Sequence, residues 1–157
     1  MTVRLLLVLL CAVLAACSSF EAKWRAAKTP ATRWDGRWTS EKHTAPGGGP
    51  AGGRLRCVLG ETAVATGCFP APRGSRPVTA HALRADFHAN WLLFSNGYTM
   101  TLTPVKNSRT EFHGTHDLPK MFGGTYRYTA HFSGEHFTAR YDSGYDHGTF
   151  DLTRVRP

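Results

Sequence analysis

After its first sixteen residues, the chain contains no long apolar run. Nothing beyond Cys17 approaches the roughly eighteen consecutive apolar residues of a membrane-spanning helix, so none is predicted there. Acidic residues are also few: 11 Asp and Glu stand against 19 Lys and Arg, which gives a formal charge of +8. The basic residues are dispersed, and this pattern does not favour a nucleic-acid partner. It favours attraction to anionic lipid head groups or cell-wall polymers.

Metal and catalytic motifs are equally scarce. No second pair of cysteines or well-spaced histidines accompanies Cys57 and Cys68, so no metal site and no cofactor is predicted. His113 and His116 are three residues apart, and on a strand such residues point to opposite faces. No nucleophile motif is present. The chain is therefore not expected to be an enzyme.

The N-terminus has the pattern of an exported lipoprotein. Arg4 precedes an apolar run over residues 5–14 that is too short to span a bilayer, and small residues follow it. Leu14-Ala15-Ala16-Cys17 resembles the bacterial lipobox, in which a peptidase cleaves before a cysteine that carries diacylglycerol. The alternative is an ordinary signal peptide that is cut after Ala16 and leaves Cys17 unmodified.

The lipobox resemblance implies a signal peptide at residues 1–16 and a lipid-modified, palmitate-bearing Cys17. Acyl chains at this residue would anchor the protein to a membrane of the cell envelope. Ser18 resembles the signal for outer-membrane sorting in Gram-negative cells, facing the periplasm. Residues 17–33 are then expected to be the lipidated cysteine and a tether, with at most a short helical stretch and no core.

Cys57 and Cys68 are the two cysteines beyond this segment. Export implies an oxidising compartment, which favours a disulfide between them. A turn near residues 61–64 would place them opposite each other on neighbouring strands, and closing so short a loop would stabilise the fold by about 2–3 kcal/mol. The alternative is a buried free thiol, because Cys57 shares a strand face with Leu55 and Leu59.

From Trp34 onward apolar and polar residues alternate, which predicts half-buried strands. Asn96-Gly97 is a strong hairpin signal, because both residues tolerate positive φ, and Ser133-Gly134-Glu135 predicts another turn. Two Gly- and Pro-rich loops are expected at 45–53 and 70–77. The predicted strands lie near 35–43, 53–59, 64–69, 79–94, 98–104, 110–116, 124–132, 136–142 and 148–155.

These strands predict one all-β domain over residues 34–157. No amphipathic helix of ordinary length is present after residue 34. Closure of an antiparallel sheet covers its exposed edges, so the expected fold is an eight- or nine-stranded up-and-down barrel or a strongly curved sandwich.

Gly36-Arg37-Trp38, at the start of the first strand, resembles the signature that begins the lipocalin barrels. In that family the tryptophan plugs the closed end of the barrel, and a basic residue late in the chain packs over it. The resemblance implies barrel-closing roles for Gly36, Trp38 and Arg154. The alternative is two core tryptophans at the start of a strand.

An eight-stranded interior is either filled by side chains or hollow enough for one small ligand. Buried phenols need hydrogen-bond partners that a ligand could supply, so Tyr126, Tyr128 and Tyr141 are candidate ligand-lining residues. The leading hypothesis is a non-catalytic envelope lipoprotein whose barrel binds a small apolar or amphipathic molecule. The alternative is a structural or protein-interaction module with a filled barrel, including one of hydrolase-inhibitor type.

A polar cluster is expected where the first and last strands meet. In one interpretation these residues form an acid/base pair or a metal site of oxygen and nitrogen ligands. In the other, which we favour, they build the turn. A hydrolase is the least expected function. The residues concerned are Glu41, His43, Asp142, Asp146 and His147.

Overall fold

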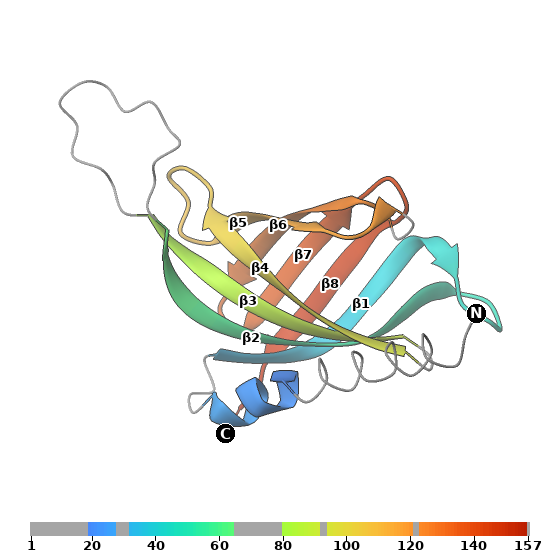
Figure 1. The fold of residues 1–157 in the computed structure, drawn as a ribbon, viewed down its shortest axis with the longest axis horizontal. Helices are drawn as coiled ribbons and strands as arrows, with labels where there is room; N and C mark the ends of the chain where they lie inside the picture. The colour runs from blue at the N-terminus through green and yellow to red at the C-terminus, as the bar shows by residue number, and fades with distance from the viewer. Residues whose placement is uncertain (1–18, 28–31, 65–79, 92–93, 121–122, 157) are drawn as a thin grey trace, which may run out of the picture.

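The computed structural model describes residues 19–27, 32–64, 80–91, 94–120 and 123–156. A closed barrel of eight antiparallel strands accounts for most of them, and the strands pair in sequence order, with β8 closing against β1 (Figure 1). The prediction of an up-and-down barrel is confirmed. The strands are β1 (Arg33–Thr44), β2 (Pro50–Val64), β3 (Ala80–Trp91), β4 (Phe94–Pro104), β5 (Glu111–Asp117), β6 (Thr125–Ser133), β7 (His136–Asp142) and β8 (His147–Arg154).

The barrel closes tightly at one seam and loosely at another. Seven residue pairs join β1 to β8, whereas three join β4 to β5, so the two strands of the second seam diverge beyond Leu102 and Gly114. Gly36 is required at the tight seam, because a Cβ there would lie 2.0 Å from the carbonyl oxygen of Asp151. Glycine therefore allows the first and last strands to approach closely.

The hairpin between β3 and β4 turns earlier than Asn96-Gly97 predicts. Trp91 pairs with Phe94, and Asn96 lies within β4 opposite Ala89. Neither Asn96 nor Gly97 has a positive φ. The predicted and observed registers differ by an even number of residues, which leaves every side chain on the same face. Alternation alone therefore could not distinguish the two registers.

β2 also differs from prediction. It continues through Val64 and pairs with β3 as far as Ala80, so the turn expected at residues 61–64 is wrong. The predicted strand at 64–69 and the loop at 70–77 lie outside the described residues, apart from Val64 itself. The turn at Ser133-Gly134-Glu135 is confirmed, with Gly134 at a φ of 60°.

The expected disulfide is not formed. The Cys57 thiol is free and has no exposed surface, because its position on β2 places it in the core. The buried free thiol, kept open as the alternative, is what the structure contains. Burial raises the pKa of this thiol well above its usual range, and the nearby charge of Asp86 adds to the effect. Cys68 lies outside the described residues.

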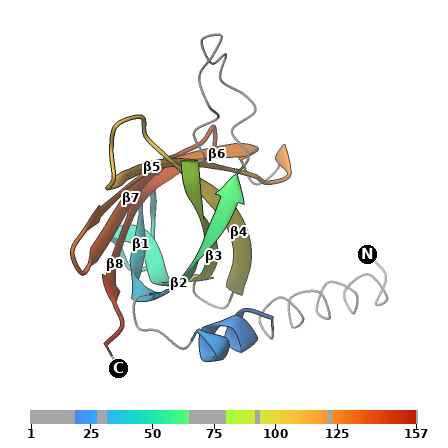
Figure 2. The ribbon, with the colours of Figure 1, turned by 90° about the vertical axis from the view of Figure 1, so that its left-hand side faces the viewer.

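Part of the expected tether is instead packed against the barrel. Residues 19–26 form a helix on the outside of the wall (Figure 2), and the Phe20 side chain within it is only 4% exposed. The expectation of no core contribution before residue 34 is therefore wrong. Among the described residues, no helix has the length and apolar character needed to cross a bilayer.

Candidate functional site

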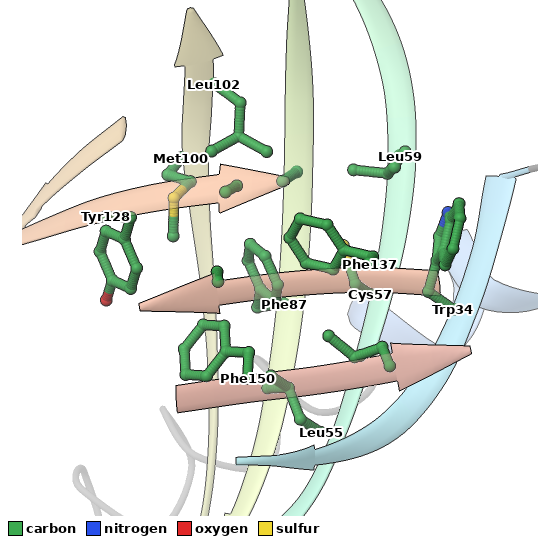
Figure 3. Close-up of a cluster of buried hydrophobic side chains, with 14 of the residues drawn as sticks. Trp34, Leu55, Cys57, Leu59, Phe87, Met100, Leu102, Tyr128, Phe137 and Phe150 are labelled. Carbon is green, nitrogen blue, oxygen red and sulfur yellow. The ribbon is translucent and has the colours of Figure 1, made fainter. Parts of the chain in front are cut away.

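The interior of the barrel is filled by aromatic rings. Phe87 lies on β3 and Phe137 on β7, which are opposite walls of an eight-stranded barrel, yet their ring centroids are 6.2 Å apart. Phe150 on β8 approaches Phe87 to 5.6 Å. Figure 3 shows these rings gathered between the strands. Rings of this size meeting across the lumen leave no room for cargo between them.

Trp34, rather than Trp38, lies beneath Arg154. The guanidinium carbon of Arg154 is 5.3 Å from the Trp34 ring centroid, and the two residues are paired in register. The Trp34 ring is 2% exposed and meets Phe132 and Phe137 edge-on. Trp38, to which the resemblance assigned this contact, is half-buried and donates its indole N–H to the Asn90 carbonyl. The cation–π contact therefore covers one end of the barrel through the preceding tryptophan.

The three candidate tyrosines form a single group. The ring centroids of Tyr126, Tyr128 and Tyr141 are 6.1 to 6.4 Å apart. The Tyr141 hydroxyl donates a hydrogen bond to the Asp146 carboxylate at 2.9 Å. Burial raises the pKa of all three phenols, and they remain protonated at neutral pH.

A buried hydrogen-bond network centres on Asp146. Its carboxylate accepts bonds from the Ser40 hydroxyl at 2.6 Å, the Tyr141 hydroxyl at 2.9 Å and the His147 backbone N–H at 2.8 Å. The Ser40 hydroxyl oxygen in turn accepts a hydrogen bond from the backbone N–H of His43. The network joins the end of β1 to the turn between β7 and β8. In this network the Ser40 hydroxyl donates its proton directly to the Asp146 carboxylate in a hydrogen bond.

This order of groups does not suit nucleophilic catalysis. A serine nucleophile needs a base that takes its proton, with the carboxylate behind the base. Here the ring nitrogen Nε2 of His43 is 3.9 Å from Asp146 and makes no hydrogen bond, while the Ser40 proton is already committed to the carboxylate. His43 stacks on Tyr145 instead. The arrangement supports the interpretation of this cluster as turn-building.

The other members of the predicted polar cluster lie elsewhere on the rim. Glu41 pairs with Arg140 on the outer surface. Asp142 and His147 are exposed and face each other as a backbone pair at the end of the β7–β8 hairpin. Of the five residues, only His43, Asp146 and the backbone of His147 meet. Within the described residues, no group of three or more metal-ligating side chains is present.

A second polar cluster holds the helix to the outer wall. Lys23 donates to Asp86 at 2.7 Å, and Glu21 pairs with Arg56. Burial alone would raise the pKa of Asp86, but the hydrogen bonds from Lys23 and Thr99 outweigh it and lower that pKa. The Asp86 side chain is therefore a partly buried anion on β3, and it binds the helix through Lys23.

Aromatic contacts complete this attachment. The Phe20 ring stacks on His88 of β3 at 4.9 Å, and the Arg56 guanidinium lies 5.2 Å from both the Phe20 and the Trp24 rings. Burial lowers the pKa of His88, and the charge of Arg56 lowers it further. The uncharged His88 ring therefore stacks on Phe20 at neutral pH. The helix is bound by both packing and charge.

The loose seam forms an open groove of about 570 Å³ on the outer wall. Thr99, Thr101 and Thr103 of β4 form one side, and His113 and Thr115 of β5 form the other. His116 turns inward and lies 5.0 Å from the Tyr98 ring, while His113 faces the groove. The prediction that these two histidines point to opposite faces is confirmed.

No family model, curated protein or solved structure matches this chain. The lipocalin and lipobox resemblances therefore stay predictions.

Sequence reasoning missed the helix attachment and Ser40. Phe20 and Trp24 are four residues apart, the spacing that puts two side chains on one helix face, and this signal could have predicted an amphipathic turn. No local signal identifies Ser40, because its partner Asp146 is 106 residues away.

Proposed function

We propose that this chain is a lipid-anchored, non-catalytic module of the cell envelope that acts through the outer surface of a filled barrel. The lipobox at Leu14-Ala15-Ala16-Cys17 supports the anchor, and anchoring through acyl chains is effectively permanent when two or more are attached. The domain is then a structural or protein-interaction module at an envelope membrane, the outer membrane in a Gram-negative cell.

The observation that carries the choice of a filled barrel is the meeting of Phe87 and Phe137 across the lumen. Both side chains are essentially unexposed, so a small apolar ligand would have to displace them. Displacing packed core rings costs several kcal/mol, which weak binding of a small molecule does not supply. Surface interaction is therefore favoured over enclosed cargo.

The anchor is tested by metabolic labelling with palmitate in a bacterial host that expresses the full chain. Wild type is expected to incorporate the label and to fractionate with membranes. Cys17→Ala should lose both properties. Cys11→Ala is the matched control, because it removes a cysteine from the predicted signal peptide without touching the lipobox. Equal labelling of the Cys17 variant would refute the anchor.

The filled barrel is tested with a fluorescent fatty acid as the probe. Wild type is expected to show no saturable binding of the fatty acid and none of benzene. Phe137→Ala leaves a cavity in the lumen of about the size of the deleted ring, so this variant is expected to bind benzene. Stoichiometric binding by wild type, displaced by unlabelled fatty acid, would favour the enclosed-ligand hypothesis instead.

A further inference from the structure

We propose that the helix at residues 19–26 fixes the orientation of the barrel on the membrane, with the wall of β3 and β4 resting on anionic lipid head groups. The inference rests on the lipidation of Cys17 proposed above. It goes further, because a lipidated cysteine on a loose tether would leave every orientation of the barrel open.

The chain between the anchor and the barrel is short. Cys17 is two residues before Ser19, the first described residue of the helix, and two Cα steps span at most about 7 Å. The polar zone of one bilayer leaflet is about 5 to 7 Å thick. With its acyl chains in the bilayer, Cys17 therefore holds the first turn of the helix at the level of the head groups.

The helix is also held to the barrel. Phe20 is buried against His88, and the pair of Lys23 with Asp86 fixes the same turn. Ser19 lies beside Gly97 and Thr99 of β4, where they line one small hollow with Phe20. Whatever holds the first turn at the membrane therefore holds this part of the wall there also. Figure 2 shows the helix lying along the outside of the barrel.

This region, which we call the helix face, carries an excess of positive charge. Basic side chains outnumber acidic ones in this region. It includes the helix, the barrel residues that contact the helix, and the residues that form ion pairs with those barrel residues. A basic residue close to an anionic bilayer raises the affinity for that surface about fivefold. Anionic head groups are thus the complementary partner. The helix face comprises Lys23, Arg25, Arg33, Arg56 and Arg84, with Glu21 and Asp86 as its two acidic members.

The test is photo-crosslinking in the full, lipidated chain. A benzophenone amino acid replaces Thr101 on β4 in one variant and Thr138 on β7 in the other. Both threonines are exposed, and β7 is three strands from β4 and opposite β3 in the closed barrel. Each protein is purified from membranes, checked for lipid by intact mass, and placed in vesicles of phosphatidylethanolamine and phosphatidylglycerol. The readout is the yield of covalent lipid adducts.

We expect the yield at Thr101 to exceed that at Thr138 several-fold. Phe20→Ala, which removes the aromatic attachment, should reduce the difference between the positions, whereas Ala22→Ser, on the exposed side of the helix, should preserve it. Circular dichroism checks that both variants keep the barrel.

The outcomes separate this inference from the proposal on which it rests. If the intact mass lacks the diacylglyceryl group, the proposed anchor fails, and the inference fails with it. If the protein is lipidated but both positions crosslink equally, or Thr138 crosslinks more, the inference alone is overturned. A preference for Thr101 that persists in Phe20→Ala also overturns it, because the helix attachment would then not be its cause.

Discussion

Replacing Asp146 by alanine tests whether the polar end of the barrel is structural. The carboxylate accepts three hydrogen bonds, at 2.6 Å from Ser40, 2.9 Å from Tyr141 and 2.8 Å from the His147 N–H. The Ser40 and Tyr141 side chains are buried. Without the carboxylate, the Ser40 hydroxyl would lose its acceptor, and the Tyr141 hydroxyl would keep only its longer bond to the Thr39 carbonyl, at 3.4 Å. Leaving a buried donor unpaired costs about 1–3 kcal/mol.

The orphaned Ser40 hydroxyl, the weakened bonding of the Tyr141 hydroxyl and one lost backbone bond give an expected destabilisation of about 4 kcal/mol for Asp146→Ala. The free energy of unfolding of a domain is usually about 5–15 kcal/mol, so this loss would be a large part of the total stability. At about 4 °C per kcal/mol for a domain of this size, the melting temperature should fall by about 15 °C. Asp146→Asn, which keeps one acceptor oxygen, should lie between the variant and wild type.

Urea unfolding followed by tryptophan fluorescence gives the free energies, and calorimetry gives the melting temperatures. Asp142→Ala is the matched control, because Asp142 is exposed on the same hairpin and should change stability by less than about 0.5 kcal/mol. If Asp146→Ala costs under about 1 kcal/mol, or no more than Asp142→Ala, the reasoning is refuted. The network would then not be what holds this end of the barrel.

Three further predictions concern packing, protons and the free thiol. Gly36→Ala should destabilise the barrel strongly, because its Cβ would overlap the carbonyl of Asp151, whereas Gly60→Ala, with no atom within 4 Å, should not; equal melting temperatures would contradict this. Burial lowers the pKa of His116, so the native state resists protonation. The stability that this contributes is complete above about pH 6.5 and decreases as pH falls through the lowered pKa. His116→Gln should therefore flatten the dependence of the unfolding free energy on pH below about pH 6.5, and an unchanged slope would count against this. Finally, iodoacetamide should label Cys57 only as fast as the domain unfolds, because the thiol is buried and its pKa is raised; peptide mapping that finds rapid native labelling would disprove this.

The strands were predictable because alternation is a local signal. The returning strand Tyr98, Met100 and Leu102 faces inward as the pattern requires, and a sheet with one apolar face closes most simply into a barrel. Registers were less predictable. Asn96 and Gly97 can form a turn, but they lie in β4, where the observed register pairs Phe87 with Tyr98 and stacks their rings. A shift by an even number of residues is invisible to alternation.

The partners in the candidate sites were the least predictable feature. The sequence named Asp146 but not Ser40, and it named Arg154 but assigned it to Trp38 rather than to Trp34. Both errors have one cause: the partners are far apart in the chain, and closure of the sheet alone brings them together.

By itself, therefore, the sequence determined the all-β class and the inward-facing aromatic residues, because a period of two sorts side chains onto two faces wherever it occurs. Only the tertiary structure decided that Phe87 and Phe137 meet across the lumen, that Cys57 is buried as a free thiol, and that residues 19–26 pack on the wall. These outcomes depend on the separation of opposite walls and on which surfaces closure leaves for the helix to cover. Both are properties of the closed barrel and of no single segment.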